Sequence, residues 1–394
     1  MSKQQLQNIK DEIAAAIDEH KDALIALSLR LHSQPEVGFQ EKKAAAWLAD
    51  YLESEGFSVE RGICDLPTAF RATDGRGKPA VGFLAEYDAL PKLGHACGHN
   101  LIAASAVGAA LGVRHVLRRR AGRITVVGTP AEEVGATKGL MAQRGAFDGL
   151  DAAMLVHPGS HDSASEQALA CIGLNVEFLG KAAHAAVRPE DGINALNALI
   201  LSFNAIDALR QHIPGTARVH GIITAGGEAA NIVPHYAAGS FLVRALDLGY
   251  LEVLKDRVIG CFEGAARATG AQLRYQWTDD VYAPLRQNQP LANLFAQNLQ
   301  MLGRAVSPPD TSGQGLGSTD MGNVSQVVPA IHPSLAIVPH RISLHSPEFA
   351  QAAGSSAGQE GMLLAAKAMA WTAADLILQP AELARVKADF LAEG

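Results

Sequence analysis

The chain has 394 residues, of which 48% are hydrophobic, 19% charged and 5% aromatic. This composition predicts a globular α/β protein of two domains and excludes a disordered chain, which would be poor in apolar residues. The formal net charge of −7 gives little electrostatic support to a nucleic-acid partner.

The first part of the chain alternates helical and strand-like segments. The predicted elements are helices at about 5–31, 41–55 and 101–117 and strands at 79–85, 123–128 and 152–156. Apolar runs bounded by turn residues indicate the strands, and a long helix of small residues separates the first two of them. This β-α-β rhythm predicts a mostly parallel sheet flanked by helices.

The pattern changes near residue 168, where six further segments follow one another. They are strands at 168–180, 220–227, 237–247 and 271–280 and helices at 191–212 and 250–269. A strand-helix-strand-strand-helix-strand series is typical of a split ferredoxin-like unit. From about 285 the helix-strand rhythm resumes, with a strand at 334–340 and an alanine-rich helix at 355–379. We therefore predict one α/β domain made of residues 1–168 and 284–394, with an α+β domain of residues 169–283 inserted into it.

Cysteine usage and the apolar runs bear on the cellular compartment. The four cysteines lie far apart and form no disulfide framework, which is typical of a reducing environment. Residues 1–20 show a charged amphipathic pattern rather than a basic and then apolar secretory signal. The longest apolar run, Leu101 to Val113, is shorter than the roughly 20 residues that span a bilayer. We expect a cytoplasmic protein without a membrane partner.

Ligand-type side chains lie just beyond four predicted strand ends. Cys97 and His99 flank a glycine in GHACGHN, and thiolate and imidazole suit zinc or a similar transition ion. Glu132 and Glu133 follow the next strand, where adjacent carboxylates persist more readily if a cation neutralises part of their charge. His157 follows the third strand, and a further histidine lies beyond the strand at 334–340.

These segments together predict a metal site. Ligands of open parallel sheets bind at the carboxyl ends of the strands, where all four segments are expected to meet. Ligands in excess of the four of a closed zinc site indicate a pair of metal ions. His161 and His340 are the alternatives to His157 and His345, and the sequence separates them only weakly.

Several motifs extend this pattern over the chain. They are EYDALP (86–91), HACGHN (95–100), PAEE (130–133), GKAAHAA (180–186), ANIVP (230–234), STDMG (318–322) and LHSPEF (344–349). With these motifs the chain resembles, over essentially its whole length, the dinuclear metallopeptidase family (peptidase family M20, subfamily D). That family includes aminoacylase, hippuricase, plant indole-acetyl-amino-acid hydrolases and p-aminobenzoyl-glutamate hydrolase. The GHN sequence, in place of the commoner GHD, is most similar to the branch with aminobenzoyl-glutamate hydrolase and dipeptidase-like members.

The resemblance implies roles for residues of the larger, catalytic domain. The implied metal ligands are Cys97, His99, Glu133, His157 and His345, with Cys97 bridging two divalent ions of zinc or manganese, or else cobalt. It also implies that Glu132 is the catalytic base, which activates a water between the ions. Many relatives have His-x-Asp where this chain has Glu86-Tyr87-Asp88. His99 is therefore expected to replace that histidine, with Asp88 behind the ligands.

The resemblance also implies roles for the inserted domain, which would be a lid and dimerisation domain. His184, Asn231 and Arg244 would bind the substrate or the developing oxyanion, and His184 would reach the neighbouring subunit of a homodimer. The implied substrate is a small amide with a free carboxylate, such as an N-acyl amino acid, an aminobenzoyl-glutamate-like amide or a dipeptide.

Two other functions remain open at this point. Cys97 could be the nucleophile of a Cys-His hydrolase, although the paired glutamates and the excess of ligands argue against it. The chain could also be a catalytically inactive metal-binding or ligand-binding homologue. The presence of Glu132, which no ligand set requires, argues against that alternative.

Overall fold

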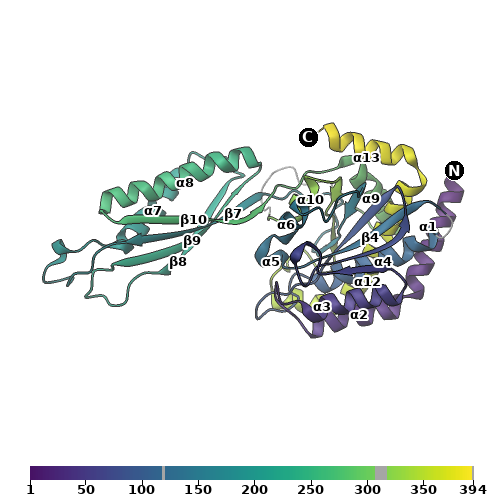
Figure 1. The fold of residues 1–394 in the computed structure, drawn as a ribbon, viewed down its shortest axis with the longest axis horizontal. Helices are drawn as coiled ribbons and strands as arrows, with labels where there is room; N and C mark the ends of the chain where they lie inside the picture. The colour runs from purple at the N-terminus through teal and green to yellow at the C-terminus, as the bar shows by residue number, and fades with distance from the viewer. Residues whose placement is uncertain (118–119, 307–316, 393–394) are drawn as a thin grey trace. The chain divides into compact units, whose positions relative to one another are not determined.

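The computed structural model describes residues 1–117, 120–306 and 317–392. Internal contacts divide the chain into two units. The first holds the described residues among 1–167, 285–306 and 323–392, and the second holds residues 168–284 and 317–322. The second unit is therefore inserted into the sequence of the first, as the colour order in Figure 1 shows.

In the described part of the first unit, six strands form one sheet in the order β1-β2-β4-β3-β5-β11. They are β1 (Ser58–Arg61), β2 (Phe70–Arg76), β3 (Ala80–Glu86), β4 (Gly122–Thr129), β5 (Ala152–Met154) and β11 (Ala330–Ile331). The strands from β4 to β11 are parallel, whereas β1 and β2 pair antiparallel. Sequence periodicity missed β1 because three of its four residues are exposed, which leaves no alternation. Beyond β5 and β11 the short strands β6 (His157–Gly159) and β12 (Ser334–Ala336) form a parallel pair.

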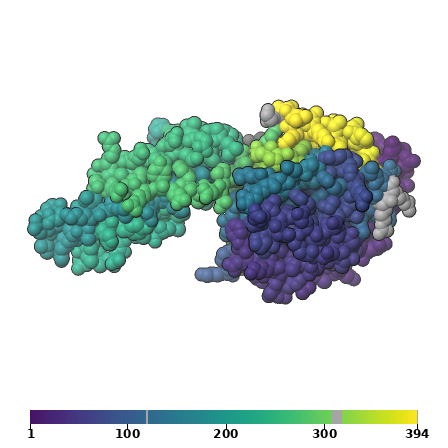
Figure 2. Space-filling view, in the orientation of Figure 1, coloured from purple at the N-terminus to yellow at the C-terminus, as the bar shows by residue number. Residues whose placement is uncertain are grey.

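Helices surround this sheet, and those near the N-terminus appear in purple and blue on the face of the first unit seen in Figure 2. The helices outside the inserted residues 168–284 are α1 (Lys3–Glu19), α2 (Lys21–Ser33), α3 (Lys42–Ser54), α4 (His99–Leu117), α5 (Glu132–Gly135), α6 (Thr137–Gln143), α9 (Gln289–Met301), α10 (Met321–Ser325), α11 (Pro347–Ala353), α12 (Ser356–Leu378) and α13 (Pro380–Ala392).

The prediction of a single helix over residues 5–31 is wrong, because the structure has two helices there, α1 and α2. The chain turns at His20, whose N–H bonds back to Ile17 and whose ring lies 3.4 Å from the Tyr51 hydroxyl.

Helix α4 lies in the core of the first unit, and its small residues allow close packing. A Cβ at Gly108 would lie 3.0 Å from Leu24 of α2 and 3.1 Å from Ala366 of α12, so glycine permits both approaches. Helices α4 and α12 are long and apolar enough to cross a membrane, but 89% and 83% of their apolar stretches are buried inside the protein. This burial is what the core helices of a globular unit show.

The second unit has the predicted ferredoxin-like order of elements. They are β7 (Ala170–Leu179), α7 (Ala195–Arg210), β8 (Arg218–Ala225), β9 (Tyr236–Ala245), α8 (Leu248–Thr269) and β10 (Gln272–Tyr282). The strands form an antiparallel sheet in the order β10-β7-β9-β8. Both helices cover one face of that sheet (Figure 1), over a core in which Phe178, Phe241 and Phe262 meet. The α/β fold with an inserted α+β domain is confirmed.

Candidate metal centre

A tight turn between β3 and α4 places Cys97 and His99 at the carboxyl edge of the parallel strands. Gly98 has a φ of 77°, and a Cβ there would lie 2.4 Å from Pro158 Cγ, so the turn requires glycine. Helix α4 begins at His99, and both Cys97 and His99 are buried.

Asp88, just after β3, orients two of the expected ligands. Nδ1 of His99 lies 2.9 Å from the Asp88 carbonyl oxygen and 3.0 Å from Asp88 Oδ1, and the Glu133 N–H donates to Asp88 Oδ2 (3.0 Å). A carbonyl oxygen only accepts, so Nδ1 of His99 carries the proton. In the neutral ring this leaves the lone pair of Nε2 for a metal ion, the arrangement typical of metal-binding histidines.

His157 is held in the same way from the third strand end. Its Nδ1 lies 2.7 Å from the Pro158 carbonyl oxygen, and its Nε2 lies 3.3 Å from Cys97 Sγ. Its ring stands edge-on to that of His99, with 6.0 Å between the ring centres. Ligand atoms of the two imidazoles and the sulfur of Cys97 therefore lie within 4.8 Å of one another.

His345 reaches the same place from a distant segment. Its backbone N–H donates to the Ala96 carbonyl (3.0 Å), and its left-handed φ of 60° turns the side chain so that Nε2 lies 3.3 Å from Glu133 Oε1. The expected ligands and Glu132 form three clusters, each with ligand atoms within 4.8 Å of one another: Cys97–His99–His157, Cys97–Glu133–His345 and His99–Glu132–Glu133. We call these six residues the metal cage.

The chemistry of the metal cage fits a divalent cation. Among the residues that the structure describes, His99 Nε2 and Glu133 Oε1 are buried without a hydrogen bond, apart from the 3.3 Å approach of His345 Nε2 to Glu133 Oε1, which is costly unless an ion binds them. Burial raises the pKa of the Cys97 thiol, so a thiolate there requires a nearby positive charge. Burial alone would lower the pKa of His99, but Cys97 and Asp88 raise it well above its ordinary value. The surroundings of His99 thus favour positive charge, which a metal ion supplies.

Three residues beside the cage, namely Glu86, Lys138 and His332, were missed as site residues from the sequence. Glu86 lies 2.6 Å from Lys138 Nζ and 3.5 Å from His99 Nε2. Burial would raise the pKa of Glu86, but the charges of Lys138 and His99 lower it to about 2. The His332 ring centre lies 5.5 Å from that of His157, and burial lowers its pKa to about 3. His332 follows β11. The expectation that ligands lie at the carboxyl ends of strands would have included it if this two-residue strand had been recognised in the sequence.

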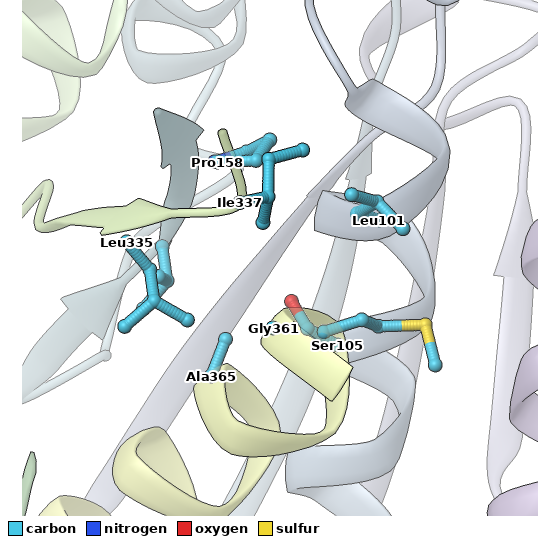
Figure 3. A pocket seen from close by; sticks show the side chains of 9 residues that line it. Leu101, Ser105, Pro158, Leu335, Ile337, Gly361 and Ala365 are labelled. Carbon is cyan, nitrogen blue, oxygen red and sulfur yellow. The ribbon is translucent and has the colours of Figure 1, made fainter. Parts of the chain in front are cut away.

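The alternative ligands and a nearby cavity lie outside the metal cage. His161 pairs with Glu166 (2.9 Å) and meets the His340 ring, and neither histidine joins a cluster among the described residues. Beside Pro158 lies a small pocket that is lined mainly by apolar side chains, among them Leu101, Leu335 and Ala365 (Figure 3). Ser105 at its wall donates to the Ile102 carbonyl, so the cavity offers a substrate little polar recognition.

In the second unit, His184 and Asn231 lie on neighbouring exposed loops. The Asn231 carbonyl accepts from the Ala185 N–H (2.9 Å). Nδ1 of His184 accepts from the backbone N–H groups of Ala186 (3.3 Å) and Val187 (3.2 Å). An accepting Nδ1 places the ring proton of neutral His184 on Nε2, which makes that nitrogen a hydrogen-bond donor.

Arg244 lies on β9 in the same unit. Its Nη1 donates to Ser318 Oγ (2.8 Å), so the STDMG motif supplies a hydroxyl that holds the guanidinium. Arg244 pairs across the sheet with Cys171 on one side and Arg218 on the other. Among the residues that the structure describes, only Nη1 of this half-buried guanidinium has a hydrogen-bond partner, and a guanidinium with free donors is suited to binding a carboxylate.

Thiolate, imidazole and carboxylate groups at the carboxyl edge of a parallel sheet, beside a further glutamate, define a metal-dependent hydrolase. Comparison with known proteins identifies the family of this hydrolase. The model described as peptidase family M20/M25/M40 matches residues 82–350, and the chain belongs to this family. The resemblance seen in the sequence motifs is thereby confirmed.

Individual relatives cover nearly the whole chain. It is 39% identical to the Xaa-Arg dipeptidase of Mus musculus, over 98% of this chain and 93% of that protein. It is 31% identical to one of the subunits of p-aminobenzoyl-glutamate hydrolase from Escherichia coli, over 95% and 93% of the two chains. The crystal structure of a dinuclear metal-binding M20 peptidase from Bacillus subtilis shares the fold, with a TM-score of 0.70 and 20% identity over 92% of this chain and 99% of that one.

Proposed function

We propose that this enzyme hydrolyses the amide bond of small substrates with a free carboxylate, using two divalent metal ions. The single observation that carries the proposal is the convergence of the metal cage from four distant segments, with buried ligand atoms that no hydrogen bond from the described residues satisfies. The proposed metal ligands are Cys97, His99, Glu133, His157 and His345. Cys97 belongs to two clusters and is the proposed shared ligand. Zinc, manganese and cobalt all suit this ligand set.

Glu132 is the proposed catalytic base. Its neighbour Glu133 belongs to two of the clusters and is proposed as a metal ligand, whereas the Glu132 carboxylate belongs to one and lies within 4.8 Å of ligand atoms of both His99 and Glu133. When bound, the ions polarise the carbonyl and lower the pKa of water from ~15.7 to about 7. Glu132 then takes the proton of the attacking water and delivers it to the leaving nitrogen.

The inserted unit is proposed to bind the substrate. His184 would donate a hydrogen bond from Nε2 to the oxyanion, because its Nδ1 already accepts from the backbone. Asn231 would add an amide donor from the adjoining loop. Arg244 would bind the substrate carboxylate with the guanidinium that Ser318 orients.

The relatives indicate which substrates to try first. Extensive identity to an Xaa-Arg dipeptidase favours dipeptides with a basic C-terminal residue. The similarity to p-aminobenzoyl-glutamate hydrolase supports a second class, amides whose amine part is an acidic amino acid. Both classes carry a free carboxylate, which is the group proposed for Arg244, and N-acyl amino acids form a third class with the same feature.

A Cys97 nucleophile is the weaker alternative. Reactive cysteines have lowered pKa values in partly exposed, electropositive surroundings. Burial raises the pKa of Cys97, and the residue is only 7% exposed. These surroundings suit a metal ligand better than a nucleophile.

We also propose a cytoplasmic homodimer with no nucleic-acid or membrane partner. Strand β8 lies at the edge of the inserted sheet and exposes Ile222 (64%) and Ile223 (44%), which favours pairing with a second copy. Free cysteines suit a reducing compartment, and the net charge of −7 disfavours nucleic acid. A monomer mass in sedimentation equilibrium would contradict the dimer.

The test of the proposed function combines metal analysis with a hydrolysis screen. Wild type should contain two ions per chain and hydrolyse at least one of the three substrate classes. Glu132→Gln should keep both ions and lose about 10²–10⁴-fold in kcat, the usual contribution of a general base. Glu360→Gln, at an exposed position on α12, is the matched control and should keep wild-type activity. Full activity of Glu132→Gln would disprove the assignment.

A further inference from the structure

The turn that carries Glu132 is held by two buried carboxylates. Ala131 is fully buried and adopts a left-handed conformation with a φ of 55°, which is unfavourable for a residue with a side chain. The Ala131 N–H donates to Glu41 Oε1 (2.7 Å), and the Glu133 N–H donates to Asp88 Oδ2 (3.0 Å). Glu132 therefore lies between two backbone amides that are each fixed by a carboxylate.

Glu41 does not serve the helix at whose start it lies. It occupies the N-cap position of α3, but its side chain makes no capping hydrogen bond. Glu36 performs that task, because its Oε2 accepts from the backbone N–H groups of Lys43 (2.8 Å) and Ala44 (2.9 Å). The Glu41 carboxylate is thus free to point away from α3 and into the first unit.

The surroundings of Glu41 suit a single orientation. The residue is completely buried, Oε1 accepts from Ala131, and Oε2 accepts from the Thr68 hydroxyl (3.3 Å). The Tyr87 hydroxyl in turn donates to the Thr68 carbonyl, which fixes the segment that carries Thr68. A buried carboxyl is costly, and here its contacts reach the strained turn rather than a helix end.

We propose that Glu41 is a positioning residue for catalysis, which acts through the Ala131 N–H to hold the Glu132 carboxylate in place. The inference rests on the proposed function, because it assumes that Glu132 is the base. Without an acceptor at Glu41, the Ala131 N–H would be buried and unpaired, and the turn would relax from its left-handed conformation. A small displacement of a catalytic group lowers the rate strongly, by up to roughly 10²-fold for about 1 Å.

The test compares substitutions of similar length at two glutamates. Glu41→Met fills the same volume without an acceptor and should lower kcat by about 10²-fold, with KM and metal content unchanged. Glu41→Gln keeps an acceptor for Ala131 and should retain kcat within about threefold, since the amide oxygen can still accept from the same N–H. Glu36→Met is the matched control, because it removes a carboxylate that binds backbone N–H groups of the same helix. It should lower the melting temperature and leave kcat unchanged.

A double variant separates positioning from a general structural effect. If Glu41 acts only through Glu132, Glu41→Met should cost almost nothing further in the Glu132→Gln background, because the two effects are not additive. Should Glu41→Met fail to fold, Glu41→Asp decides, since its shorter side chain withdraws the acceptor from Ala131. A folded variant without the acceptor that keeps wild-type kcat would overturn the inference, and so would loss of metal or a Glu41→Gln variant as slow as Glu41→Met. Activity of Glu132→Gln alone would instead refute the proposed function.

Discussion

The metal cage of the first unit and the proposed substrate residues of the second unit differ in burial. His99 is completely buried and His157 is half-buried, and each has Nδ1 fixed by a backbone carbonyl. By contrast His184 and Asn231 are exposed on loops, where water can satisfy any polar group. Buried polar atoms without a partner indicate a missing ion, whereas an exposed histidine by itself indicates nothing. The metal cage can therefore be recognised from burial and hydrogen bonding, whereas the substrate residues could be predicted only from the family motifs.

Substitutions in the metal cage and in the inserted unit are therefore expected to have different effects. Changes in the cage should alter metal content and activity together, because the same side chains are proposed to hold the ions on which the reaction depends. Changes in the inserted unit should leave the metal content intact and affect either kcat or KM. Each of the following experiments measures metal content and activity, so each can contradict the assignment of metal binding to the first unit and of substrate binding to the second.

The largest effect is expected from Cys97→Ala. This variant removes the thiolate from two of the three clusters, so metal content should fall, and kcat/KM should fall by more than about 10²-fold, at or beyond the range seen when groups that support a metal site are lost. Cys261→Ala, a half-buried thiol on α8, is the matched control and should change neither. An inactive Cys97→Ala enzyme that still holds both ions would point to the nucleophile alternative.

A smaller effect is expected from His184→Ala. Loss of one oxyanion donor typically costs about 10²–10³-fold in kcat, and the metal content should remain that of the wild type because His184 belongs to the second unit. His212→Ala changes an exposed histidine of the same unit and should be silent. Loss of metal in His184→Ala would show that the two regions are not separable in the way proposed.

Local sequence patterns explain which parts of the fold and of the site could be predicted. Parallel strands end at one edge of a sheet, so Cys97, Glu133 and His157 could be expected together from apolar runs alone. The ferredoxin-like insertion was predictable because its strands and helices carry clear periodicities. Glu41 gave no signal, since it lies at the start of a helix and 90 residues from the amide that it binds. Contacts of that separation depend on tertiary packing and leave no trace in local sequence.

Other failures have equally specific causes. His332 was missed because β11 has only two residues, too few to show a period. Lys138 is a lysine in a short helix, a position that is exposed in most proteins, and it is buried here because it pairs with Glu86. The break at His20 interrupts a continuous helical pattern without glycine or proline, so periodicity could not reveal it.

The smallest effect is expected from Arg244→Ala, and it is selective. Loss of a charge-assisted contact to a carboxylate, worth about 1.5–3 kcal/mol, should raise KM roughly 10–100-fold for substrates with a free carboxylate. Substrates whose carboxylate is amidated should be little affected, and metal content should not change. Arg218→Ala is the matched control, because Arg218 pairs with Arg244 across β8 and β9 but uses its guanidinium on the Ala217 carbonyl. Equal losses for the free and the amidated substrate would show that Arg244 supports the β-sheet and does not recognise the carboxylate, which would leave the inserted unit without its proposed part in specificity.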